Sequence, residues 1–388
     1  MKSPTKIGIV GTGFIAKGLI KAIQTQSDII VSSILTRRKI EGMGSFPNKE
    51  LLTNSVWEII ENSDLVVECT GDVIYGTKVI DKVFSASLPV ITMNSELQVT
   101  TGSYFANRGF ITEAEGDQPG CLAALNENIL QMGFKPLVYG NLKGFLNLNP
   151  IKEDMEYWGK RNNLSLQMVT SFTDGTKVQI EQTLVANGLG ADILQTGLLR
   201  PEAEDVDSGG IYLARQAKEH GSAISDYLVC PKGPAGVFIT AEHEENQRDA
   251  LRYFKLGDGP YFTLIQNFHL CHLEILKTIR RVVNGGGVLL NNTAEPAISV
   301  GAVAKTKINS GEKITHGIGS FQVRGEAVRI KENKGHLPIG LLNNAVITRP
   351  IEEGQFITFE DVEIPDSLAL KAWIETETKS LNLHQVNK

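Results

Sequence analysis

Hydrophobic residues in the first part of the chain occur in short runs that alternate with amphipathic segments of helical length. Residues 6–10, Lys-Ile-Gly-Ile-Val, show almost no polar alternation, which is typical of a parallel strand buried on both faces. Further runs of this kind lie at 29–35, 64–71, 87–94 and 109–114. The alternation predicts an α/β fold with a doubly wound parallel sheet, in which ligands bind at the carboxyl ends of the strands.

A glycine-rich loop follows the first run and opens a segment with helical spacing. It reads G-x-G-x-x-A and consists of Gly11, Thr12, Gly13, Phe14, Ile15 and Ala16. Gly11 permits a tight turn, Gly13 lets a pyrophosphate approach the backbone, and Ala16 lets the helix lie close to the strand. The helix start also offers free N–H groups to phosphates. The loop therefore predicts a Rossmann dinucleotide-binding domain; the alternative is a plain glycine-rich turn.

The end of the second run is basic. A site for NAD commonly has an acidic residue about 20 residues beyond the loop, where it binds the ribose hydroxyls. This chain has Thr36, Arg37, Arg38 and Lys39 at that point. Because a guanidinium suits the 2′-phosphate of NADP, we expect NADP as the cofactor, with NAD as the alternative. A solvated basic turn would explain the same residues without a cofactor.

The later runs bring further groups to the same edge of the predicted sheet. The third run ends in Cys69, Thr70 and Gly71, the next ends at Asn94, and Glu115 begins the string Glu-Gly-Asp-Gln-Pro-Gly. Because the carboxyl ends of parallel strands meet at one edge, we expect these residues to surround the cofactor.

The middle of the chain supplies candidate catalytic groups. A strand-like run at 137–144 is followed by a predicted helix, at whose start Asp174 and Lys177 could share one face. A lysine can polarise a carbonyl oxygen, and an acid beside it can orient it or carry a proton. The alternative is a helix-capping aspartate with an exposed lysine. His269 and His272 could bind a metal on one helix face, but no third ligand has suitable spacing, so we expect no metal site and structural histidines, or a substrate contact from His269.

Residues 295–365 carry short strands and turns instead of long helical periodicity. An apolar strand followed by Ile-x-x-Gly occurs twice, with Ile308 and Gly311 in one copy and Ile351 and Gly354 in the other. This repeat predicts a small β domain with internal pseudo-symmetry.

The length of 388 residues exceeds what one core usually holds, so several domains are expected. We expect a dinucleotide-binding domain at 1–138, an α+β catalytic and oligomerisation domain at 139–294 whose last helix returns to the first domain, a β domain at 295–370, and a tail at 371–388.

Composition narrows the class of protein. The formal net charge of -6 argues against a broad nucleic-acid-binding surface. No apolar run approaches the ~20 residues that cross a bilayer, so we expect no membrane partner. The chain begins almost directly with a strand-like run and its four cysteines lie far apart, so we expect no signal peptide, reduced thiols and a cytoplasmic location.

Together these segments resemble the homoserine-dehydrogenase-like oxidoreductases that carry an appended SAF domain, and most closely the deoxyxylulose-phosphate reductoisomerase-like branch. The resemblance rests on 10–16, 115–120, 171–177 and 261–274, while 351–362 resembles the SAF module, a β-clip fold. It implies an NAD(P)-dependent enzyme that reduces or oxidises a small hydroxylated or phosphorylated carbonyl compound, and a homo-oligomer.

The resemblance also implies roles for single residues. Homoserine dehydrogenases place an aspartate and a lysine of one helix in the substrate site, which implies catalytic roles for Asp174 and Lys177. They normally have a lysine after the asparagine of the fifth strand, where this chain has Ser95, and this counts against homoserine dehydrogenase itself. We hypothesise that Lys143 supplies the missing cation. A non-catalytic nucleotide-sensing or scaffold protein is the alternative from another class.

Overall fold

The computed structural model describes residues 3–382. Its amino-terminal part is a six-stranded sheet with neighbouring strands in the order β3-β2-β1-β4-β5-β6, all of them parallel. This is the strand order of a doubly wound dinucleotide-binding sheet, so the predicted α/β fold class is confirmed. The strands are β1 (Thr5–Val10), β2 (Ile29–Leu35), β3 (Leu52–Thr53), β4 (Leu65–Glu68), β5 (Val90–Thr92) and β6 (Ile111–Glu113).

Helices cover both faces of this sheet because its strands are apolar on both sides. One face packs against α1 (Phe14–Ile23) and α12 (Ile275–Val283), and the other against α2 (Val56–Asn62) and α3 (Val73–Ser85). Ile275 and Ile279 share one core with Ile7 and Ile9, so the chain returns to the first sheet after a long excursion. Three short elements follow β5: α4 (Ser95–Leu97), a π-helical turn η3 (Gln98–Gly102) and α5 (Ser103–Ala106).

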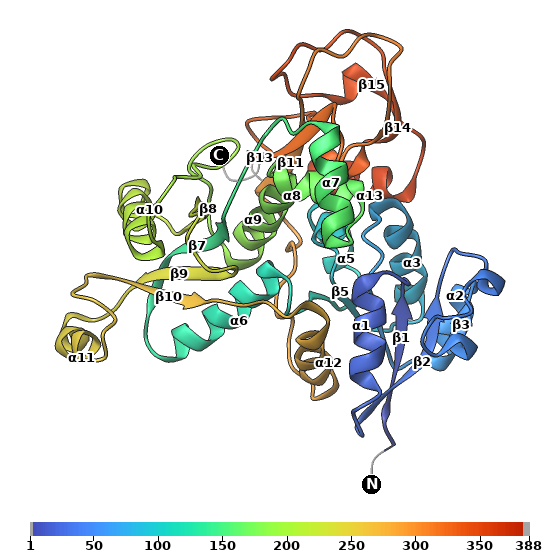
Figure 1. Ribbon diagram of the computed structural model, residues 1–388, viewed down its shortest axis with the longest axis horizontal. Helices are drawn as coiled ribbons and strands as arrows, with labels where there is room; N and C mark the ends of the chain where they lie inside the picture. The colour runs from blue at the N-terminus through green and yellow to red at the C-terminus, as the bar shows by residue number, and fades with distance from the viewer. Residues whose placement is uncertain (1–2, 383–388) are drawn as a thin grey trace.

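A second, mixed sheet of order β10-β9-β7-β8 lies beside the first (Figure 1). One face packs against α6 and α9, and the other against α10, while α9 lies at the centre of the molecule. The predicted strand near 137–144 and the predicted helix that carries Lys177 near its start are confirmed. The elements are β7 (Lys135–Lys143), β8 (Ile224–Val229), β9 (Val237–Glu242), β10 (Tyr261–Gln266), α6 (Gln118–Gln131), α7 (Lys152–Asn162), α8 (Leu166–Thr173), α9 (Thr176–Leu189), α10 (Val206–His220) and α11 (Arg248–Tyr253).

The strands of residues 298–363, here called the C-terminal β module, confirm the predicted internal pseudo-symmetry. The backbones of Ile308 and Ile351 exchange two hydrogen bonds of 2.9 Å each. The two glycines behave alike: the Gly311 N–H donates to the carbonyl of Ile347, and the Gly354 N–H donates to that of Ala304. The strands are β11 (Ile298–Ala304), β12 (Lys313–His316), β13 (Val323–Arg329), β14 (Asn343–Ile347) and β15 (Val362–Glu363).

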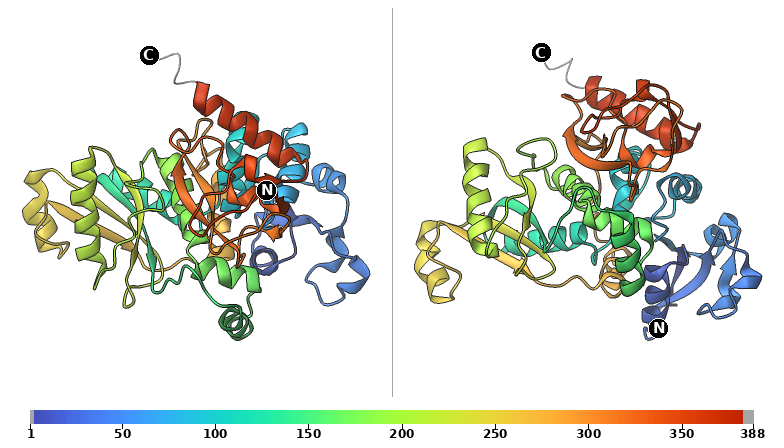
Figure 2. Two further views of the ribbon diagram at one scale, coloured as in Figure 1. Left: turned by 90° about the horizontal axis from the view of Figure 1, so that it is seen from above. Right: turned by 45° about the horizontal axis from the view of Figure 1, so that its top comes forward.

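Residues 368–382 form a helix, α13 (Leu368–Asn382), where the sequence pattern predicts the end of the β domain and a tail. It lies beside the C-terminal β module (Figure 2) and contacts α3 and α5 of the first sheet. Trp373 is buried, and both carboxylate oxygens of Glu375 lie 3.0 Å from one guanidinium nitrogen of Arg108. The last part of the expected tail, 383–388, lies outside the described residues. Among residues 3–382, no helix is long and apolar enough to cross a membrane.

Candidate active site

The glycine-rich loop has the backbone that its sequence predicts. Gly11 has a φ of +117°, and a Cβ there would lie 2.9 Å from the Cys69 carbonyl oxygen, so only glycine fits without strain. Gly13 precedes α1, and a Cβ on it would meet open space. The first turn of α1 has neither an acidic residue nor a side-chain cap, which leaves its N–H groups free for an anion.

Thr12 and Thr36 join this loop to the end of β2. Their hydroxyl oxygens lie 3.2 Å apart, and both side chains are buried. Arg37 follows on the surface, where its guanidinium lies 2.8 Å from a carboxylate oxygen of Asp72 and 4.4 Å above the Tyr75 ring. Arg37 thus stands at the carboxyl end of β2, where the adenosine ribose of a dinucleotide binds in this fold. The backbone N–H of Arg38 donates to Thr36 Oγ1.

A buried carboxylate, which no sequence motif singles out, organises the end of β4. Glu68 accepts hydrogen bonds from the Thr70 backbone and hydroxyl and from Thr92 Oγ1. Cys69 and Gly71 lie in the same turn, and Asn94 caps α4 by accepting the Leu97 N–H. Burial, together with the charges of Glu68 and Glu113, raises the pKa of the Cys69 thiol and so favours its neutral form.

Glu115 is held by the returning helix. Its carboxylate lies 2.5 Å from Lys277 Nζ, and its N–H donates to Thr278 Oγ1. The next residue, Gly116, has a φ of +115°, and a Cβ on it would lie 2.3 Å from the Cys271 carbonyl oxygen. For Glu115 to contact a cofactor, as the sequence predicts, its carboxylate would have to share or leave the ion pair with Lys277 of α12.

Lys177 contacts three carboxylates at the junction of the two sheets. Its Nζ is 3.1 Å from Glu96, 3.4 Å from Asp117 and 3.9 Å from Glu181. Burial disfavours the ammonium, but the carboxylates of Asp117, Glu96 and Glu181 outweigh it and raise the pKa of Lys177 well above its usual range. Lys177 is therefore a fixed positive charge at neutral pH.

Glu181 lies one helical turn beyond Lys177 and links it to Lys143. Its second oxygen is 3.7 Å from Lys143 Nζ and accepts a 2.8 Å hydrogen bond from Asn141. The side chain is 1% exposed, and burial raises the pKa of Glu181 to about 7. The structure thus brings Lys143 and Lys177 to one carboxylate that the sequence analysis did not name. The spacing Lys-x-x-x-Glu was the available sequence signal for Glu181, because residues four apart in a helix lie on the same face.

One further acid, Glu113, completes the group. Ser95 Oγ lies 3.1 Å from Glu113 and 3.1 Å from Asp117. Burial and the charge of Asp117 raise the pKa of Glu113 well above its usual range. We call the whole set the Lys177 cluster, and its members are Glu96, Glu113, Asp117, Lys143, Lys177 and Glu181.

Asp174 is separate from the Lys177 cluster, and the expected pairing of Asp174 with Lys177 is wrong. Asp174 ends α8, and its carboxylate lies 2.6 Å from Lys305 Nζ of the C-terminal β module. Both side chains are almost fully buried. The sequence places Asp174 and Lys177 three residues apart, but Gly175 adopts a left-handed conformation between them and turns the two side chains in different directions.

His272 packs against α1. A Cβ on Gly18 would lie 2.4 Å from the His272 ring, and Phe14 meets that ring edge-on with centroids 5.9 Å apart. Phe14 itself is 72% exposed beside the glycine-rich loop. In the part of the chain that is described, no group of three or more His, Cys, Asp or Glu side chains is arranged to hold a metal ion.

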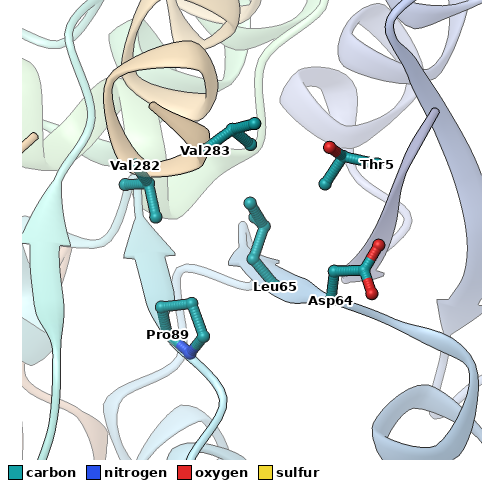
Figure 3. A pocket seen from close by; sticks show the side chains of 6 residues that line it. All are labelled: Thr5, Asp64, Leu65, Pro89, Val282 and Val283. Atoms are coloured by element: carbon teal, nitrogen blue, oxygen red, sulfur yellow. The ribbon is translucent and has the colours of Figure 1, made fainter. Parts of the chain in front are cut away.

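A pocket of about 260 Å³ lies at the opposite edge of the first sheet (Figure 3). The pocket is lined by residues at the amino ends of β1, β4 and β5 and at the end of α12: Thr5, Asp64, Leu65, Pro89, Val282 and Val283. Because Asp64 already accepts the Lys6 N–H, few polar groups converge there. The ligand edge of a doubly wound sheet is the other one, where the Lys177 cluster lies.

Comparisons with known proteins found a family model and several solved structures that resemble parts of this chain. The family model described as oxidoreductase DRL, catalytic domain, matches residues 116–275. No curated protein matches the chain. The first structural similarity is to Staphylococcus aureus homoserine dehydrogenase, at 18% identity and a TM-score of 0.25, and it covers 33% of this chain and 41% of that chain.

Two longer similarities are to homoserine dehydrogenases as well. A hyperthermophilic archaeal enzyme in complex with NADPH has 13% identity and a TM-score of 0.45 over 74% of this chain and 99% of its own. The Thiobacillus denitrificans enzyme has 12% identity and a TM-score of 0.44 over 84% of this chain and 90% of its own.

The oxidoreductase match spans the segment that supplies Asp117, Lys143, Lys177 and Glu181. The first sheet supplies the glycine-rich loop at the same edge. The candidate site therefore combines a segment that matches an oxidoreductase catalytic domain with the ligand edge of a dinucleotide-binding fold.

Proposed function

We propose that this protein uses NADP to reduce or oxidise a small hydroxylated or phosphorylated carbonyl compound, with Lys177 at the reacting oxygen. The observation that carries the proposal is the buried Lys177 ammonium among Glu96, Asp117 and Glu181 at the ligand edge of a dinucleotide-binding sheet. A buried, preorganised cation at that edge stabilises the negative charge that develops on a carbonyl oxygen.

When bound, the nicotinamide would donate hydride in the reductive direction and accept it in the oxidative direction, while the chain would supply a fixed charge and a group that gives or takes the proton. Lys177 holds its proton too tightly to be an efficient acid near neutral pH, because its pKa is raised well above the usual range. Glu181, with a pKa of about 7, is suited to give or take the proton. We therefore assign electrostatic stabilisation to Lys177 and proton transfer to Glu181.

Lys143 gives the site a second cation. It shares Glu181 with Lys177 and is 16% exposed, so a phosphate or carboxylate of the substrate can reach it. Deoxyxylulose phosphate is the substrate that the reductoisomerase-like resemblance implies, and homoserine is the second candidate. Ser95 disfavours homoserine, because its buried hydroxyl is engaged with Glu113 and Asp117 at the position of the expected lysine.

We propose further that the C-terminal β module is of the SAF type and that the protein forms a homo-oligomer. The repeated backbone pairing of Ile308 with Ile351 supports the first proposal. Light scattering of the purified protein tests the second, since a monomer mass would contradict it.

NADPH is expected to bind at least about tenfold more tightly than NADH, because Arg37 can leave Asp72 for a 2′-phosphate. Fluorescence titration measures both affinities. Changing Arg37 and Arg38 together to Ala should remove the preference, whereas the exposed pair Arg248 and Arg252, changed to Ala, should leave it intact. Asp72→Asn should strengthen NADPH binding by freeing Arg37.

Tight NADPH binding justifies a screen of phosphosugars and homoserine for turnover. If neither nucleotide binds at micromolar concentration, the proposed cofactor use fails and a non-catalytic scaffold becomes the better interpretation. Binding of both nucleotides without turnover of any carbonyl compound would favour a nucleotide sensor.

A further inference from the structure

Helix α9 presents two different faces. One face carries Lys177 and Glu181, which belong to the Lys177 cluster. Thr176 and Gln179 instead accept hydrogen bonds from the backbone of β13, at the N–H groups of Gly325 and Ala327. Farther along, Asn187 accepts the N–H of Ile298 at the start of β11. The helix that carries the reactive groups is thus fastened along its length to the C-terminal β module.

One side chain of that module reaches the start of α9. Lys305 follows β11, is 2% exposed, and lies 2.6 Å from Asp174 Oδ2 and 2.6 Å from the Ser320 carbonyl oxygen. A lysine this deeply buried needs a partner of opposite charge, and Asp174 is that partner.

Asp174 in turn holds the first turn of α9. The helix starts after Gly175, which has no side chain to cap it. Asp174 Oδ1 takes that role by accepting the Thr176 N–H at 2.8 Å. Lys177 follows Thr176 directly. The orientation of Asp174 therefore fixes the helical turn from which the Lys177 side chain extends.

We propose that Lys305 is a positioning residue: through Asp174 it fixes the first turn of α9 and so places Lys177 among its carboxylates. The effect on catalysis rests on the proposed function. The structural coupling, by which Lys305 holds Asp174 and Asp174 holds the first turn of α9, does not depend on substrate. It gives the C-terminal β module a direct part in shaping the site.

The coupling can be tested in the full-length protein by amide hydrogen exchange with mass spectrometry. In Lys305→Met, we expect exchange in peptides covering 174–185 to speed up by about tenfold or more, because Asp174 keeps a buried charge without a partner. Peptides of β1 and α1 should keep their protection, and NADPH affinity should stay within about twofold. The matched control is Lys307→Met, which removes an exposed lysine of the same module that pairs with Glu352.

The double variant Lys305→Met/Asp174→Asn provides the rescue. The asparagine side chain in this variant can still accept the Thr176 N–H but needs no cation, so the slow exchange of 174–185 should return. Unchanged exchange of that segment in the single variant would overturn the proposal. Equal loss of protection throughout the chain, without rescue in the double variant, would overturn it too, since that is a general loss of stability.

A second readout applies once the substrate screen has found a reaction. Displacement of Lys177 should shift the pH at which kcat/KM changes, whereas a smaller amount of folded enzyme would only scale the whole curve. An unshifted curve in Lys305→Met would contradict the positioning role. If the screen finds no reaction, the proposed function fails, while hydrogen exchange still decides the coupling.

Discussion

Lys177→Met should lower kcat by about three orders of magnitude, because the charge that stabilises the developing oxyanion is lost from a buried site. NADPH should still bind with nearly unchanged affinity, since we propose that its phosphates and ribose bind at the glycine-rich loop and Arg37, away from Lys177. Turnover of the substrate from the screen, together with NADPH titration, measures the two effects separately.

Methionine matches the length of lysine but leaves Glu96, Asp117 and Glu181 without their shared cation. A fall in activity must therefore be compared with thermal unfolding of the variant. Lys135→Met is the control, because Lys135 pairs with Glu244 on an exposed part of β7. A Lys177→Met protein that stays folded and keeps wild-type kcat would show that the reacting oxygen lies elsewhere.

Glu181→Gln should lower kcat/KM by about a hundredfold and flatten its pH dependence near 7. In the oxidative direction the wild-type rate should rise with pH through about 7, as Glu181 loses its proton and becomes a base. In the reductive direction the same group should act as an acid, so the rate should fall over that range. Initial rates measured from pH 5.5 to about 8.5 test both directions.

The same carboxyl links stability to pH. Glu181 has a pKa of about 7 in the folded chain and an ordinary value of 4.5, so the folded state binds more protons between these values. Its contribution to the free energy of unfolding is present at low pH and is lost as the pH rises toward 7. Glu181→Gln should remove this slope, and Glu244→Gln, on an exposed acid, should retain it. An unaltered rate profile in Glu181→Gln would exclude proton transfer by this residue.

The fold of the amino-terminal domain was predictable because its signals are local. The run ending at Val10, the loop from Gly11 to Ala16 and the basic turn at Arg37 each lie within a few residues. A glycine at a positive φ and an apolar strand buried on both faces have sequence signatures that do not depend on distant contacts.

The candidate active site was predictable only in part, because distant segments build it. Lys143 and Lys177 were named from the sequence, but Glu181 joins them through contacts between β7 and α9. Glu96 and Asp117 come from the ends of other strands, and no short motif relates them to Lys177. The partner of Asp174, Lys305, lies 131 residues away, so spacing alone favoured the nearer lysine.

The most direct test of the account is a crystal structure of the protein with NADPH. We expect the pyrophosphate at the amino end of α1 and the 2′-phosphate at Arg37. We also expect that the nicotinamide C4 faces the Lys177 cluster, so that a carbonyl carbon about 3–3.5 Å away would have its oxygen at Lys177 Nζ. A nicotinamide ring directed away from Lys177, or a nucleotide bound outside the glycine-rich loop, would contradict the account.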